Sequence, residues 1–97
     1  MGALASEARL ETTVPRRYLS QLCKHFQHKL EVTLAEQTGR IAFPAGVCDL
    51  RADTDLLILR AEAETEETLR TVEDVISRHL QRFAFREAPE LTWARAA

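Results

Sequence analysis

The sequence predicts an α+β domain in which two amphipathic helices cover one face of an antiparallel sheet. Three observations lead to this prediction: short runs of alternating polar and apolar residues, two longer segments with helical spacing, and four consecutive strands separated by turn residues. Four consecutive strands can pair as a meander, and two amphipathic helices need an apolar surface to bury. The expected element order is β-α-β-β-β-β-α-β, without the regular strand–helix alternation of a dinucleotide-binding fold.

Length and composition indicate one globular domain. The chain has 97 residues, of which 45% are hydrophobic and 29% are charged. We expect residues 1–9 to form a flexible N-terminal tail and residues 10–97 to form a single α+β domain. The first strand is predicted over residues 10–14, where apolar or β-branched side chains take alternate positions. Pro15 ends this strand and suits a first helical turn, because its missing N–H would be unpaired there.

The first helix is predicted from Arg16 to about Lys29. Its apolar side chains fall within a sector of about 80° when each residue turns the helix by about 100°. Cys23 lies beside this sector, so its side chain is expected to face the core. The sector consists of Leu19, Leu22, Phe26 and Leu30.

Four strands are predicted between the two helices. The turns at residues 36–39 and 43–46 contain the glycine or proline that tight turns favour. In the strand that follows the second turn, Cys48 takes an apolar position and is expected to point inward. The last of the four is almost continuously apolar, which indicates a central strand. The predicted strands cover residues 30–34, 40–43, 47–52 and 56–63.

The second helix is predicted to begin near Thr65 and to end near Phe85. Its apolar stripe spans about 80° and includes His79, an unusual residue for such a position. A closing strand is predicted over residues 91–93, after Pro89. The stripe consists of Leu69, Val72, Ile76, His79, Leu80 and Phe83.

Charge and hydropathy argue against nucleic acid and membranes as partners of the chain. The formal net charge is −2 and the pI is about 5.9, so the chain lacks the general positive field that gathers nucleic acid. No apolar run approaches the 18 residues of a membrane span, and the first residues lack the basic start and apolar stretch of a secretory signal. We expect a cytoplasmic protein that has reduced cysteines and binds neither nucleic acid nor membrane.

Known catalytic motifs do not appear in the sequence. It contains no phosphate-binding loop, dinucleotide fingerprint, metalloprotease histidine pair or serine elbow, and only three glycines. The basic residues of the two helices could form an anion-binding patch, or they could be solvated faces balanced by nearby acids. These basic residues are Arg16, Arg17, Lys24, Lys29, Arg78, Arg82 and Arg86.

Five cysteine and histidine residues form the candidate metal site. His25 and His28 are three residues apart on one helix face, where two imidazoles can share an ion. Cys23, Cys48 and His79 take inward-facing positions on three different elements, and thiolate and imidazole are good ligands for zinc or iron. The alternative is that these three residues belong to the core, with the cysteines as small hydrophobes and the histidine bonded to a carbonyl.

Two other functions remain open at this stage. A cysteine–histidine enzyme would need a thiolate–imidazole pair, with Asp49 or Glu73 as the orienting carboxylate. Burial raises the pKa of a core-facing thiol and makes it inert, which counts against this alternative. A purely structural interaction domain would instead expose an apolar patch or a sheet edge to a partner.

Three segments of the chain resemble an uncharacterised bacterial family, domain of unknown function 2218. They are 15–29 (PRRYLSQLCKHFQHK), 39–48 (GRIAFPAGVC) and 79–87 (HLQRFAFRE), and the resemblance extends over about residues 10–93. The family pattern falls on the five candidate metal residues. Relatives that lie beside, or are joined to, siderophore-interacting flavin reductases imply a link to iron acquisition, with such a reductase or a ferric chelate as partner. The resemblance assigns no catalytic role, so we expect a non-enzymatic binding or accessory module.

Overall fold

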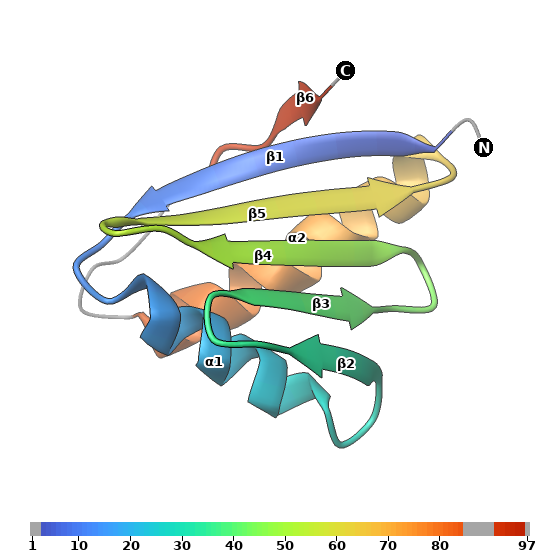
Figure 1. Ribbon diagram of the computed structural model, residues 1–97. Coiled ribbons are helices and arrows are strands. Elements are labelled where there is room, and N and C mark those ends of the chain that lie inside the picture. Colours follow the sequence, from blue (N-terminus) through green and yellow to red (C-terminus); the bar gives the residue numbers. More distant parts are fainter. Residues whose placement is uncertain (1–2, 85–90, 97) are drawn as a thin grey trace.

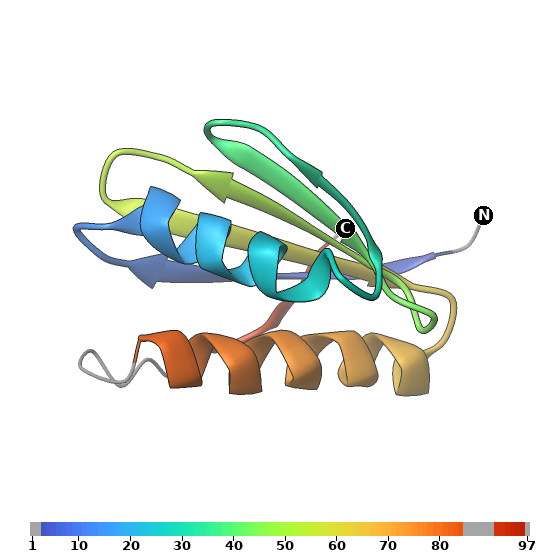
Figure 2. The same cartoon turned by 90° about the horizontal axis from the view of Figure 1, so that it is seen from below.

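The computed structural model describes residues 3–84 and 91–96, and these residues form six strands and two helices. One antiparallel sheet contains the strands in the order β2-β3-β4-β5-β1-β6 (Figure 1), and both helices lie on one side of it (Figure 2). The predicted fold class and element order are therefore confirmed. The elements are β1 Leu4–Glu11, α1 Pro15–Phe26, β2 Glu31–Leu34, β3 Thr38–Ala42, β4 Val47–Ala52, β5 Leu56–Ala63, α2 Glu66–Phe83 and β6 Ala94–Ala96.

The first strand lies earlier in the chain than predicted. β1 begins at Leu4 and pairs with β5 over all eight of its residues, so the expectation that residues 1–9 form a tail is wrong for residues 4–9. Its buried positions include Ala5 and Ala8, and alanine gives a weak strand signal because it has little side chain to pack. The stronger alternation at residues 10–14 belongs partly to the segment that leads into α1.

Smaller differences concern the ends of elements. α1 ends at Phe26 rather than near Lys29, and the closing strand is β6 rather than residues 91–93. Trp93 packs against the core instead, and its indole Nε1 donates a hydrogen bond to the Ser77 hydroxyl at 2.9 Å. α2 ends at Phe83, close to the predicted end near Phe85, and residues 85–90 lie outside the described residues.

The N-terminus of α2 is fixed by a reciprocal pair of hydrogen bonds. The backbone N–H of Thr68 donates to Thr65 Oγ1, and the backbone N–H of Thr65 donates to Thr68 Oγ1, each at 3.1 Å. This capping box satisfies two backbone donors, and Glu66 and Glu67 place negative charge at the positive end of the helix dipole. Neither α1 nor α2, the helices of the described residues, is long and apolar enough to cross a membrane.

The core lies between the helices and the sheet. α1 packs on β2 to β5, whereas α2 packs mainly on β5 and β1. A glycine in β3 allows α1 to approach closely, because a Cβ atom built on Gly39 would lie 2.5 Å from the Sγ atom of Cys23. The fully buried side chains include Leu19, Leu22, Cys23, Ile41, Cys48, Leu57, Leu59, Val72, Ile76 and Leu80.

Candidate functional site

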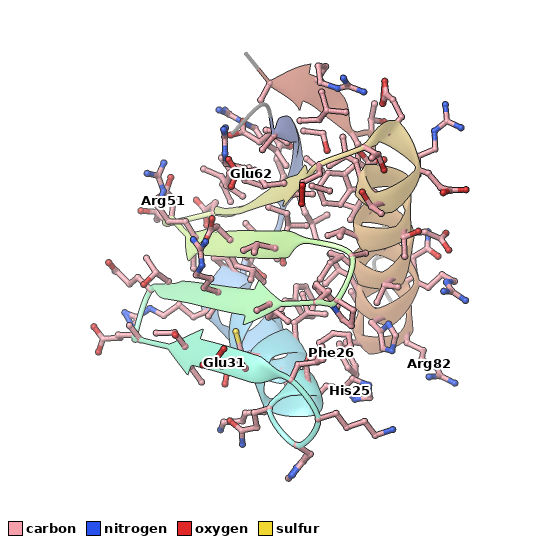
Figure 3. The ribbon with its side chains drawn as sticks, turned by 90° about the vertical axis from the view of Figure 1, so that its right-hand side faces the viewer. His25, Phe26, Glu31, Arg51, Glu62 and Arg82 are labelled. Carbon is pink, nitrogen blue, oxygen red and sulfur yellow. The ribbon has the colours of Figure 1, made fainter. Side chains whose placement is uncertain are left out.

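The two helices bring two histidines together. His25 lies in the last turn of α1 and His79 lies in the last two turns of α2, and their ring centroids are 4.8 Å apart with an interplanar angle of 50°. Figure 3 shows His25 and Phe26 beside the end of α2 that carries Arg82. The His25 side chain is exposed and His79 is half-buried, so the pair is at the boundary between core and solvent.

Aromatic side chains surround this pair on several sides. The rings of Phe26 and Phe83 lie 5.0 and 5.6 Å from the ring of His25, and Phe26 also lies 4.9 Å from His79. Phe43, from the turn after β3, packs on Phe26 at 5.2 Å. We call these five residues, His25, Phe26, Phe43, His79 and Phe83, the histidine–aromatic cluster. The rings restrict both imidazoles and shield them partly from water.

A backbone contact selects the tautomer of the neutral His79 ring. Its Nδ1 atom lies 2.7 Å from the carbonyl oxygen of Val75, one turn earlier in α2. A carbonyl oxygen can only accept, so Nδ1 carries the proton and donates it. In the neutral imidazole the other nitrogen, Nε2, is then an unprotonated acceptor that is able to bind a metal ion.

The surroundings of His25 favour its neutral form. Partial loss of hydration beside the packed rings lowers the pKa of His25 from its ordinary value of 6.5, and it is lowered further by repulsion from Arg82 and Lys29 and from His79 and His28 when these are protonated. A neutral imidazole has a lone pair available for a metal ion, whereas an imidazolium has none. Near neutral pH His25 is therefore in the state that a ligand must have.

The two cysteines lie away from water. Cys23 and Cys48 are free thiols with no exposed surface, as the sequence pattern predicted. Burial raises the pKa of Cys23 to about 11. Burial also raises the pKa of Cys48, with smaller contributions from the charges of Asp49 and Cys23. Both side chains are thiols at neutral pH, which is the unreactive form.

The predicted orienting carboxylates are engaged elsewhere. Asp49 accepts two hydrogen bonds from Arg40 at 2.9 and 3.1 Å on the other face of the sheet. Glu73 accepts a hydrogen bond from the buried hydroxyl of Ser6 at 2.6 Å. The geometry therefore gives no support to a thiolate–imidazole–carboxylate arrangement.

The five predicted metal residues do not meet at one point. His28 is exposed beyond the end of α1, and the two sulfur atoms lie in the core. Within residues 3–84 and 91–96, no group of three His, Cys, Asp or Glu side chains is placed to hold a metal ion. Of the predicted set, His25 and His79 are the two whose rings the structure places in contact at the surface. Sequence periodicity could not predict this pair, because it depends on how two helices cross.

A second feature, on the sheet face opposite the helices, was missed in the sequence. Figure 3 shows Arg51 and Glu62 projecting from the sheet on the side away from α2. Four arginines from β1, β3, β4 and β5 line a hollow of about 410 Å³ on this face, together with the carboxylates of Glu7 and Asp49. We call it the arginine face; its arginines are Arg9, Arg40, Arg51 and Arg60.

The signal for the arginine face was present but incomplete. Arg51 takes a polar position in a strand that was predicted to alternate, which predicts exposure on the side away from the core. Arg9 fell in the segment expected to be a tail, and Arg60 fell in a strand that is almost continuously apolar. Alternation does not give the strand order or the register, so it could not show that the four lie together. The basic residues of the helices, which the sequence did single out, are more dispersed: Arg16 and Arg17 begin α1, Arg78 pairs with Asp74 at 3.1 Å, and Arg86 lies outside the described residues.

The fold defines the chain as a two-layer α+β domain, and sequence comparison places it in a family. The model of the family described as "Uncharacterized protein conserved in bacteria (DUF2218)" matches residues 7–94, so the chain belongs to this family. The NMR structure of PA4090 from Pseudomonas aeruginosa is similar, with a TM-score of 0.81 and 34% sequence identity over 94% of this chain and 95% of that chain. A search of curated proteins found no match.

Proposed function

We propose that the domain is a non-enzymatic binding module that holds a divalent transition-metal ion between His25 and His79. The observation that carries the proposal is the separation of 4.8 Å between the two ring centroids. Metal–nitrogen bonds of about 2.1 Å place the ring centres of two imidazoles at neighbouring positions of one ion roughly 5 Å apart. The separation supports a shared ion, to which each ring would contribute one nitrogen.

The two imidazole rings suit a transition-metal ion of intermediate softness. Imidazole binds zinc, copper, iron and nickel, and the hydrogen bond from His79 Nδ1 to Val75 is the kind of outer contact that orients a metal-binding histidine. Two protein ligands leave several positions of the ion open. An ion held in this way could therefore carry water or a small chelating molecule at the same time.

Some relatives in this family lie beside, or are joined to, siderophore-interacting flavin reductases, and this association suggests iron as the physiological ion. Reduction of a ferric chelate yields ferrous iron, which imidazole binds. In this proposal the domain is an accessory module that receives the reduced ion from such a partner. The rival enzyme hypothesis needs a reactive thiolate, and burial of Cys23 and Cys48 counts against it.

Calorimetric titration with zinc, and with ferrous iron under anaerobic conditions, tests the proposal. We expect saturable binding of about one ion per chain at pH 7.5. His25→Phe and His79→Phe keep an aromatic ring in the cluster but remove the nitrogens, so each should weaken binding by roughly tenfold or more. His28→Phe is the matched control, because His28 lies outside the cluster and should not contribute.

The same titration separates metal binding from simple packing. If the histidines serve only as aromatic packing partners, the native chain and all three phenylalanine variants will show the same weak or undetectable binding. That result, or a loss of binding confined to His28→Phe, would overturn the proposal. A melting curve for each variant in the absence of metal establishes that the compared proteins are folded.

A further inference from the structure

We propose that two copies of the chain associate through their arginine faces, related by a two-fold axis that runs parallel to the strands between β4 and β5. Both helices of the described residues lie on the other side of the sheet, so neither of them covers this face (Figure 2). The interface shares no residue with the histidine–aromatic cluster. The proposal therefore goes beyond the metal site, and the two can be tested separately.

The arginine face is balanced in charge. Each of its four arginines has a carboxylate partner within 4 Å, and each of these side chains keeps at least 34% of its surface exposed. Such a face has no preference for a simple anion or cation, but it suits a partner on which the charges alternate in the same way. The pairs are Arg9–Glu7, Arg40–Asp49, Arg51–Asp53 and Arg60–Glu62, at 3.2, 2.9, 3.5 and 3.8 Å.

The strand register arranges charges of alternating sign in a row across the whole sheet. Each residue of the row lies directly opposite the next one on the neighbouring strand, and all of them point away from the helices. The two edge strands contribute uncharged residues at the ends of the row. In the strand order β2-β3-β4-β5-β1-β6, the row consists of Thr33, Arg40, Asp49, Arg60, Glu7 and Ala94.

The two-fold axis reverses this row and so brings unlike charges together. The midpoint of the six-stranded sheet lies between β4 and β5, so an axis at that point places β4 of one copy on β5 of the second copy, and β3 on β1. Asp49 then faces Arg60 of the second copy, and Arg40 faces Glu7 of the second copy. Because the axis relates identical chains, each of these contacts occurs twice.

The rows on either side bring no like charges together. Under the same axis, every charged side chain of these two rows faces an uncharged one of the second copy. Ile58 and Val47 flank the axis and give the long side chains of Arg51 and Glu62 an apolar surface on which to pack. Like charges in direct opposition are the main obstacle to association of a charged face, and this arrangement avoids them. The facing pairs are Arg51–Ile58, Arg9–Thr38, Glu62–Val47, Ala5–Ala42 and Glu31–Ala96.

The size of the face predicts a weak dimer. Three rows of side chains on six strands cover roughly 600 Å² per copy, given a strand spacing of about 4.8 Å and a row spacing of about 6.7 Å. Two copies together bury about 1,200 Å², which is the lower limit for a specific interface. Since charged contacts dominate this interface, we expect a dissociation constant in the high micromolar range that increases with salt concentration.

The test is sedimentation analysis of two charge-reversed variants, studied separately and as an equimolar mixture without metal. Arg60→Asp places a carboxylate against Asp49 of the second copy, and Asp49→Arg places a guanidinium against Arg60 of the second copy. Each variant alone should therefore dimerise at least tenfold more weakly than the native chain. In the mixture every central contact again joins a carboxylate and a guanidinium, so the two variants should form a heterodimer of nearly native affinity.

Arg70→Asp is the matched control, because it makes the same charge change on the exposed side of α2. It should dimerise as the native chain does. Raising NaCl from about 0.05 M to about 0.5 M should weaken the native dimer several-fold, because salt screens the charges. Melting curves establish that each variant is folded, and Arg60→Gln with Asp49→Asn replaces a charge-reversed variant that fails to fold.

The outcomes are decisive in both directions. A native chain that stays monomeric at about 1 mM would overturn the proposal, since a weak interface of this size is populated at that concentration. An equal loss of dimer in Arg70→Asp, or a variant mixture that stays monomeric, would also overturn it. His79→Phe must leave the dimer unchanged, so a failure of the metal site and a failure of this interface remain distinguishable.

Discussion

At the residue scale, the protonation of two imidazoles determines what the histidine–aromatic cluster can bind. His79 donates through Nδ1 to the Val75 carbonyl, which leaves Nε2 as its acceptor. His25 faces the ring of His79 and the charge of Arg82, and its surroundings disfavour a proton. The two lone pairs that the cluster can offer to a metal ion are therefore Nε2 of the neutral His79 ring and a nitrogen of the neutral His25 ring.

The lowered pKa of His25 predicts that acid destabilises the fold. As the pH falls below 6.5, the ordinary value, His25 takes up a proton in the unfolded chain before it does so in the folded one. The unfolded state then binds more protons, so the free energy of unfolding decreases as the pH falls. Urea denaturation at pH 7.5 and 5.5 measures this decrease, which His25→Phe should reduce. An identical decrease in the variant would show that the effect arises elsewhere.

The burial of the two thiols predicts that they are alkylated slowly in the folded chain. In the native chain Cys23 and Cys48 should react with an alkylating reagent at pH 7.5 far more slowly than in the unfolded chain, because they are inaccessible and protonated. Mass spectrometry after brief labelling, with and without denaturant, measures the difference. Fast alkylation of either cysteine in the native chain would contradict the burial of the two thiols and favour the enzyme hypothesis.

The sequence patterns predicted which residues are buried more successfully than which residues contact one another. Cys23 and Cys48 were expected to face the core, and both do. The contact between His25 and His79 was not predicted, because helical periodicity describes one helix at a time. The same limit explains why His28, three residues from His25, was expected to join the site but lies outside the cluster.

At the element scale, the close packing of α1 on the sheet depends on the absence of a side chain in β3. Gly39 faces Cys23, whose Sγ atom would be the nearest neighbour of a Cβ atom at this position, followed by the Leu19 Cδ2 atom at 3.5 Å. Interiors are packed to near-crystalline density, so α1 cannot move away from the sheet without losing contacts along its length. The position of α1 in turn places His25 next to α2.

Gly39→Ala should therefore destabilise the domain by about 1–3 kcal/mol, the usual cost of overpacking a core. The added Cβ atom would lie 2.5 Å from Cys23 Sγ. Cys23→Ala removes the sulfur, so the double variant should be less unstable than the sum of the two single variants. Urea denaturation of all four proteins measures this coupling. Additive effects would show that the sulfur is not the obstacle.

The elements also show where sequence patterns were insufficient. The helices and the four consecutive strands were predicted because their apolar side chains are large and regularly spaced. β1 was placed too late in the chain, because alanine and serine fill much of its buried side. The long pairing of β1 with β5 stabilises these residues in the sheet, and this pairing is a tertiary effect that no local pattern contains.

At the scale of the whole molecule, the sheet separates two surfaces of different chemistry. The helix side carries the histidine–aromatic cluster, and the opposite side carries the arginine face. The fold class, element order and family were all predicted from the sequence and confirmed. The sequence could predict neither the contact between His25 and His79 nor the gathering of four arginines on one sheet face. These depend on the helix crossing and the strand register, which exist only in the folded chain. The central claim is that this crossing makes one metal ligand set from two separate helices.

A long-range 1H–15N NMR spectrum of the histidine side chains, recorded before and after addition of one equivalent of zinc at pH 7.5, tests that claim most directly. We expect His79 to carry its proton on Nδ1 before the addition, and zinc to shift Nε2 of His79 and one ring nitrogen of His25 together, with His28 unchanged. A proton on Nε2 of His79, or a zinc shift confined to His28, would contradict it.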